Sequence, residues 1–169
     1  MVIKMYDMND LFRNWESIKK QILNSNPKEI SMEVGDIIYR GGRHDSEQDA
    51  IDDLKRRPKH WTNNFNYAKN YTTHVSQGSK KIIIVAKIIS ENNLFLNYDT
   101  YDLFHVNRDS FKQDNISPVE AQCLFGVDVA NSLFDKEYSG VYEVSKSGNN
   151  EILIKDMSIF EIVDTINIE

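Results

Sequence analysis

The chain has little of the residues that cross-link or interrupt small proteins. Among its 169 residues there are one cysteine, three prolines and seven glycines. The lone Cys123 excludes an intramolecular disulfide, and its apolar neighbours predict a buried structural thiol in a protein from a reducing compartment. A chain of this length buries roughly 70% of the surface that its unfolded form exposes. We therefore expect one domain over residues 1–169.

Long apolar runs and dense metal ligands are also missing. No run approaches the roughly 20 residues that span a bilayer, and residues 1–7 lack the apolar core and cleavage site of a signal peptide. We expect a soluble protein without a membrane partner, in the cytoplasm or delivered into a host cytosol. Four histidines without paired spacing predict no metal site. Neither common glycine-rich phosphate loop is present, which excludes the most frequent nucleotide-binding folds.

Positive charge is scarce as well. The chain carries 26 acidic and 20 basic residues, a formal net charge of −6, so its surface as a whole should repel nucleic acid. The one basic cluster covers residues 55–60. We interpret it as a solvated helix end whose charges complement the helix C-terminus, in preference to a nucleic-acid patch.

The hydrophobic pattern predicts an α+β fold with a mostly antiparallel, split sheet packed by helices. An N-terminal packing helix over residues 7–24, apolar along one side from residue 10, precedes a catalytic core over about 36–168. Ser46 and Ser117 are N-cap candidates, and Ala68 and Val119 are candidate core residues of the helices that carry them. We expect loop over residues 98–102. The expected strands cover residues 37–40, 81–89, 140–144, 151–155 and 159–167, and the later helices cover residues 46–57, 65–77 and 118–133.

Residues 36–42 read Asp-Ile-Ile-Tyr-Arg-Gly-Gly, so one arginine stands at the end of an expected strand and two glycines follow it. A guanidinium is planar, always charged and bidentate, so Arg40 at a strand end can hold phosphate. Gly41 and Gly42 allow positive φ and leave room for a ligand beside the main chain. The alternative is a surface salt bridge beside a turn.

Three pieces of the chain stand in a suggestive order. They are Tyr39-Arg40-Gly41, the stretch Trp61-Thr62-Asn63 with Ala68 and Tyr71 following it, and Asn149-Asn150-Glu151 at the start of a late strand. Together they resemble the ADP-ribosyltransferase superfamily, in particular its mono-ADP-ribosyltransferases and toxin-like effectors. In that family an early strand holds NAD through arginine or histidine, a hydroxyl residue precedes an Ala-x-x-Tyr helix, and a late strand opens with the catalytic glutamate.

The resemblance implies NAD as a substrate and ADP-ribose transfer to a macromolecular acceptor, protein or nucleic acid, with NAD hydrolysis as a side reaction. It implies Glu151, Arg40 and Thr62 as catalytic residues. It implies an NAD site formed by Tyr39, Arg40, Gly41, Thr62, Tyr67 and Tyr71. The chemistry asks for these residue types, because a diphosphate must be held still and a carboxylate must face the positive charge that develops on the ribose. Tyr67 or Tyr71 can stack on nicotinamide.

Each residue also has a purely structural interpretation. Glu151 can be a solvated charge at a sheet edge, Thr62 the N-cap of the next helix, and Tyr71 part of the core. Glu143 is a second candidate carboxylate. The chain departs from the arginine-modifying members at Asn149, where they carry glutamate or glutamine, and at Trp61-Thr62-Asn63, where they carry Ser-x-Ser. Asparagine can hydrogen-bond an acceptor but cannot act as a base.

Three other functions stay open at this point. The first is a non-catalytic binding or inhibitor module on a degenerate transferase fold. The second is an RNA enzyme that removes 2′-phosphates, which would use Arg40, Arg43 and Lys59. The third is a nuclease built on His60 with Lys59 or Arg57. The sequence leaves the oligomeric state open.

Overall fold

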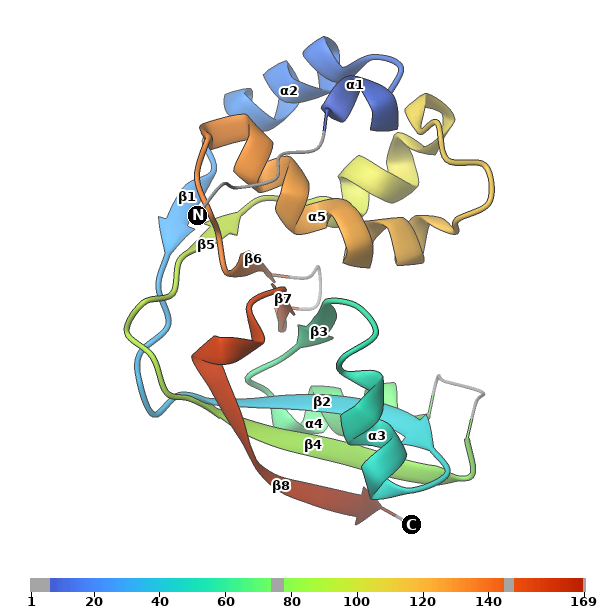
Figure 1. The fold of residues 1–169 in the computed structure, drawn as a ribbon, viewed down its shortest axis with the longest axis vertical. Coiled ribbons are helices and arrows are strands. Elements are labelled where there is room, and N and C mark those ends of the chain that lie inside the picture. The colour runs from blue at the N-terminus through green and yellow to red at the C-terminus, as the bar shows by residue number, and fades with distance from the viewer. Residues whose placement is uncertain (1–6, 74–77, 145–147, 169) are drawn as a thin grey trace.

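The chain folds into three layers, with a helical layer, a five-stranded sheet and a three-stranded sheet stacked in that order (Figure 1). The computed structural model describes residues 7–73, 78–144 and 148–168. The larger sheet has the order β1 (Lys28–Ile30), β5 (Phe95–Asn97), β6 (Gly140–Val144), β7 (Asn150–Ile154) and β3 (Lys59–Trp61). The smaller has the order β2 (Ile37–His44), β4 (Lys80–Ile88) and β8 (Phe160–Ile168). Among the strands of these described ranges, β5 and β6 are the only pair that runs parallel, so the predicted mostly antiparallel α+β class is confirmed.

The five-stranded sheet is buried on both faces because its strands alternate. Leu153 packs with the helices, whereas its neighbours Ile152 and Ile154 pack toward the three-stranded sheet. Leu96 and Phe95 divide in the same way. A side-chain period of two in a strand requires this division. One sheet therefore contributes to both cores.

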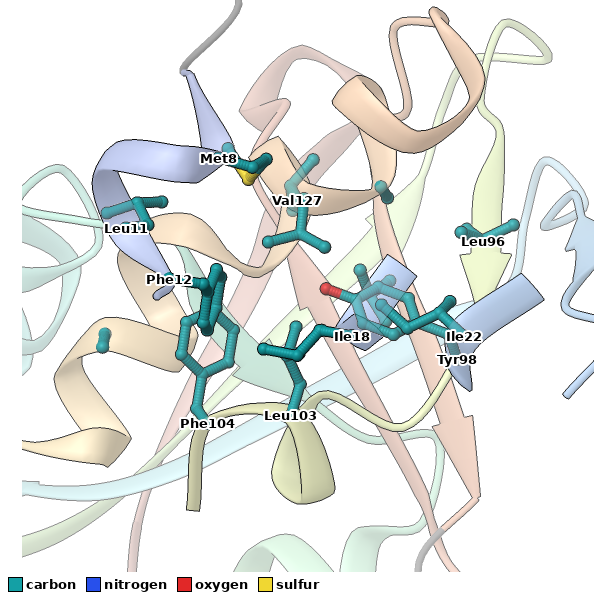
Figure 2. Packing of buried hydrophobic residues seen from close by; sticks show 14 of the residues in the cluster. Met8, Leu11, Phe12, Ile18, Ile22, Leu96, Tyr98, Leu103, Phe104 and Val127 are labelled. Carbon is teal, nitrogen blue, oxygen red and sulfur yellow. The ribbon is translucent and has the colours of Figure 1, made fainter. Parts of the chain in front are cut away.

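The helical layer packs on one face of this sheet around aromatic side chains (Figure 2). It contains α1 (Met8–Leu11), α2 (Trp15–Asn24), α5 (Pro118–Phe134) and the π-helix η1 (Asp102–Val106). Phe12 and Phe104 lie with ring centroids 5.7 Å apart, and both side chains are buried. Ser117 accepts a hydrogen bond from the amide of Glu120 and caps α5 as predicted.

The N-terminal helix is interrupted, contrary to the prediction of one helix over residues 7–24. Phe12 is extended and bridges to Phe111. The amide of Arg13 donates to Ser110 (2.7 Å) and the amide of Lys112 donates to Leu11 (2.8 Å). These long-range bonds take backbone groups that a continuous helix would use. The loop expected over residues 98–102 is found only at residues 98 and 99, because residues 100 and 101 are helical and the π-helix η1 begins at Asp102.

The remaining helices flank the smaller sheet. α3 (Glu47–Asp53) is capped by Ser46, as predicted, and α4 (Phe65–Tyr71) is capped by Asn64. The N-cap interpretation of Thr62 is therefore wrong. Both helices are shorter than expected, and the predicted end of the second at residue 77 lies outside the described residues. Ala68 of α4 is buried, as expected.

Candidate functional site

Two backbone hydrogen bonds join the two sheets at the candidate site. The amide of Tyr39 in β2 donates to the carbonyl of Thr62 (2.7 Å), and the amide of Thr62 donates back to Tyr39 (2.9 Å). Thr62 directly follows β3 and is 4% exposed. This bridge holds the arginine-bearing strand against the segment that leads into α4. Two of the three sequence pieces are thereby fixed to each other.

A pocket of about 190 Å³ opens beside this bridge. All six residues predicted for the NAD site line it, and so does the predicted catalytic Glu151; the six are Tyr39, Arg40, Gly41, Thr62, Tyr67 and Tyr71. The other lining residues are His60, Trp61, Ala68, Tyr101, His105, Val119 and Gln122. Segments that are far apart in the chain therefore meet in one cavity.

Glu151 enters the pocket from the interior of the five-stranded sheet. Its strand β7 lies between β6 and β3, and its side chain lines the pocket, so the interpretation as a solvated sheet-edge charge is wrong. The hydroxyl of Tyr67 donates a hydrogen bond to its carboxylate. Burial, and then the hydrogen bond to Glu151, hold the pKa of Tyr67 well above its usual range, so this hydroxyl stays a donor. A neutral hydroxyl thus positions the Glu151 carboxylate, and none of the ion pairs between described residues involves Glu151.

Helix α4 is positioned by contacts at its start and near its middle. The side chain of Asn64 accepts from the amide of Tyr67 (3.1 Å) and donates to the side chain of Asn149 (2.9 Å), which ties the helix start to the segment before β7. A Cβ atom on Gly41 would lie 1.9 Å from the carbonyl oxygen of Ala68. The space beside Gly41 is therefore filled by the α4 backbone rather than by a ligand. Positive φ is required at neither Gly41 nor Gly42.

Arg40 stands where the pocket meets a wider groove of about 790 Å³, and both cavities include Arg40, Gly41 and Tyr71. The guanidinium donates to the carbonyl of His60 (2.9 Å). None of the ion pairs between described residues involves Arg40. Burial lowers the pKa of Arg40, but a guanidinium stays protonated at neutral pH. The alternative of a surface salt bridge is therefore wrong for this residue.

Three other cations of the groove, Arg56, Arg57 and Lys59, are engaged with acids. Lys59 is 5% exposed and lies 3.0 Å from Asp53, so the interpretation of residues 55–60 as a solvated helix end is wrong for this residue. Arg57 lies 3.9 Å from Glu120. This pairing neutralises much of the groove. Among the described residues it leaves Arg40 and Arg43 as the candidates for an anionic ligand, and of these two only Arg40 also lines the smaller pocket.

His60 and Cys123 lie next to each other but do not form a reactive pair. The sulfur lies 3.7 Å from Nδ1 of the imidazole. Burial, with Arg40 and Arg57 adding to it, lowers the pKa of His60 to about 4, and burial raises the pKa of the thiol. Both groups are neutral near pH 7, so a thiolate nucleophile is excluded. A nuclease in which His60 acts as a cation is not supported either, and Cys123 is the buried structural thiol that was predicted.

Glu143 does not reach the pocket, although it is the cross-strand partner of Glu151. It is 8% exposed and accepts hydrogen bonds from the amide and from the hydroxyl of Thr100, the latter at 2.7 Å. Burial raises its pKa to about 7, and the two hydrogen bonds from Thr100 oppose that rise. Glu143 is thus an anchor for the segment before η1, not a second carboxylate of the cavity.

Tyr101, His105, Gln122 and Val119 form a wall of the pocket that the sequence did not indicate. Val119 was expected in the core but is 52% exposed, and Tyr71, for which a core position was considered, is 47% exposed. Gln122 is buried on a face of α5 that is otherwise apolar. A polar residue in an apolar stripe was the feature of the sequence that could have indicated its place in the pocket. The π-helix that carries His105 has no comparable local signature.

Comparisons of the chain with protein-family models, with curated proteins and with solved structures found no match. Among the described residues, no helix has both the length and the apolar character needed to cross a bilayer. In the same part of the chain, no three histidine, cysteine, aspartate or glutamate side chains are grouped to hold a metal ion. Function is therefore inferred from the geometry of the pocket.

Proposed function

We propose that the protein is an enzyme that consumes NAD and transfers its ADP-ribose to a macromolecular acceptor, with NAD hydrolysis as a side reaction. One observation carries this proposal. Glu151 and Arg40, a carboxylate and a guanidinium that come from different sheets and are not paired with each other, line the same aromatic pocket. The residues that the ADP-ribosyltransferase resemblance assigns to NAD all lie around them. Their proximity supports the roles that the resemblance implies, in which Arg40 holds NAD and Glu151 acts on the ribose.

In this proposal the nicotinamide riboside end enters the smaller pocket and the diphosphate lies at Arg40. A volume of about 190 Å³ is below the roughly 300–1,000 Å³ of sites that enclose whole drug-sized ligands. The adjoining groove of about 790 Å³ provides the additional space for the adenosine end. Tyr67 or Tyr71 offers a ring for nicotinamide to stack on.

Glu151 then acts on the ribose. As the bond from C1′ to nicotinamide breaks, its electron pair leaves with the ring nitrogen and positive charge develops on the ribose. A fixed carboxylate stabilises that charge, and it can also accept a hydrogen bond from the ribose 2′-hydroxyl. Thr62 hydrogen-bonds the ribose or helps to orient Glu151. The lone reduced thiol suits a cytosolic place of action, in the producing cell or in a host.

Calorimetric titration with NAD tests the proposal directly. We expect wild-type protein to bind NAD and to release nicotinamide. Arg40→Ala should weaken NAD binding by about 1.5–3 kcal/mol, the contribution of a charge-assisted hydrogen-bonding group, which is about tenfold to a hundredfold. Arg108→Ala, which removes a cation outside both cavities, is the matched control and should bind like wild type.

The same titration separates the alternatives. Folded wild-type protein that neither binds NAD nor releases nicotinamide in the presence of a cell extract would make it a binding or inhibitor module instead. A 2′-phosphate-removing RNA enzyme needs several unpaired cations, and Lys59 is already paired with Asp53. The acceptor class follows from labelled NAD and whole-cell lysate, treated in parallel with protease or nuclease. Loss of label under one treatment identifies protein or nucleic acid.

A further inference from the structure

The pocket wall that the helical layer contributes carries an imidazole of its own. His105 belongs to the π-helix η1, and the ring of Tyr101 stacks on it with centroids 4.2 Å apart and an interplanar angle of 12°. Both residues line the pocket together with Glu151. Single π-helical turns occur frequently at functional sites, because the wider turn moves a side chain out of the regular helical positions.

A chain of hydrogen bonds runs from a buried carboxylate to this imidazole. The hydroxyl of Thr100 donates to Glu143 (2.7 Å) and accepts from the side-chain amide of Gln122 (2.7 Å). Because its nitrogen is used in this way, Gln122 presents its oxygen to Nε2 of His105 at 3.2 Å. That oxygen can only accept, so Nε2 carries the proton and Nδ1 keeps a lone pair.

The other candidates for a base in this pocket are occupied or unsuited. Asn149 stands two residues before Glu151 and is an amide. Glu151 already accepts from Tyr67 and faces the ribose in the proposed function. His60 has its Nδ1 beside the Cys123 thiol, and its Nε2 is buried. His105 is the remaining lining group with a basic lone pair, and imidazole is the side chain that enzymes most often use as a general base.

We propose that His105 is the general base that activates the acceptor, and that Gln122 and Thr100 are positioning residues that fix its tautomer. This inference rests on the proposed function. As nicotinamide leaves with the electron pair of its bond to C1′, the acceptor oxygen forms a new bond to C1′. The proton of the acceptor passes to Nδ1 of His105, which becomes an imidazolium and later releases the proton to water.

The other charged and titratable groups that line the pocket with His105 are Glu151, Arg40, His60, Tyr39, Tyr67, Tyr71 and Tyr101. Glu143 reaches it only through Thr100 and Gln122. His105 belongs to the helical layer and Glu151 to the sheet that this layer covers. A base and a carboxylate on different layers can face the attacking and the cationic atoms separately.

The experiment compares nucleophiles that do or do not carry a proton. Wild type, His105→Gln and Glu151→Gln are incubated with NAD in water, with added methanol or with added azide. Nicotinamide, ADP-ribose, its methyl glycoside and its azide are measured by chromatography. Water and methanol must lose a proton during attack, whereas azide is an anion and needs no base. Val106→Gln places the same side chain at a 69% exposed position of the same π-helix and serves as the matched control.

We expect His105→Gln to form the water and methanol products about a hundredfold more slowly than wild type, in line with the contribution of a general base. Azide should restore its rate of nicotinamide release to within a few fold of wild type. The affinity of His105→Gln for NAD should equal that of wild type, and Val106→Gln should keep wild-type activity. Gln122→Leu, which removes the positioning oxygen, should show a smaller loss that azide also restores.

Two results overturn the inference while leaving the proposed function in place. In one, His105→Gln forms the methanol product within threefold of wild type. In the other, it loses the methanol and azide products equally, which would make His105 a structural residue or a ligand for NAD. A folded wild-type protein that releases no nicotinamide overturns the proposed function itself, so the two failures are distinguishable.

Discussion

Glu151→Gln tests the proposed chemistry at its central residue. Glutamine has nearly the same shape, and its side-chain oxygen can still accept the hydrogen bond that Tyr67 donates to Glu151. The substitution therefore removes the negative charge and leaves the hydrogen bond that positions the side chain. Because residue 151 is paired with Glu143 of β6 and the next residue, Ile152, is paired on both sides, the backbone of residue 151 should not move.

The magnitude follows from the charge that is lost. Two unit charges about 4 Å apart attract by about 4 kcal/mol at an effective dielectric constant of about 20. The ribose carries only part of a positive charge in the transition state, and the amide dipole replaces part of the interaction, so we expect a loss of about 3 kcal/mol. That corresponds to a turnover roughly a hundredfold lower. NAD binding should stay within a few fold, because the charge develops only as the bond breaks.

Steady-state nicotinamide release gives kcat and kcat/KM, and calorimetry gives the NAD affinity. An interaction made only in the transition state lowers kcat and kcat/KM alike. Glu161→Gln is the matched control, since Glu161 lies on β8 with a half-exposed side chain 3.7 Å from Lys87 and outside the pocket. Near wild-type turnover in folded Glu151→Gln protein would refute the transferase assignment.

Two further predictions concern stability and are measured by urea denaturation. Gly41→Ala should destabilise the fold by about 1–3 kcal/mol, because its new methyl group would meet the backbone of Ala68. The methyl group of Gly42→Ala would instead meet the side chain of His44, so this variant should be destabilised clearly less. Equal losses of stability would contradict the close approach of α4. Glu143 has a pKa raised from 4.5 to about 7 in the folded state, so the native protein binds its proton more tightly than the unfolded chain does. Stability should therefore fall by about 3 kcal/mol as pH rises from 4.5 through 7, and Glu143→Gln should lack this fall; parallel pH profiles of variant and wild type would show that Glu143 is not the group responsible.

The sequence by itself determined the elements whose signals are local. The apolar runs became β2, β4, β6, β7 and β8 within a few residues of the expected bounds. Ser46 and Ser117 cap their helices as expected, because an N-cap depends on atoms only two or three residues away. The six residues of the expected NAD site and the catalytic Glu151 were also selected from short pieces, and they do line one pocket.

Tertiary structure decided everything that depends on distant partners. The first helix stops at Phe12 because residues 110–112 bond to its backbone, and no residue near Phe12 in the sequence signals this. Lys59 can be buried because its charge is paired with that of Asp53 in α3. Gly41 serves the approach of α4, a contact between elements that its own strand does not reveal.

The wall of Tyr101, His105 and Gln122 shows the same limit at the site itself. These residues line the same pocket as Glu151 because the helical layer packs on one face of β6 and β7. Glu143 hydrogen-bonds Thr100 from that same face. Periodicity reports which side of an element is apolar, but it does not report which element will cover that side. The sequence therefore indicated several of the residues that line the pocket. Packing between the layers decided which partners orient them.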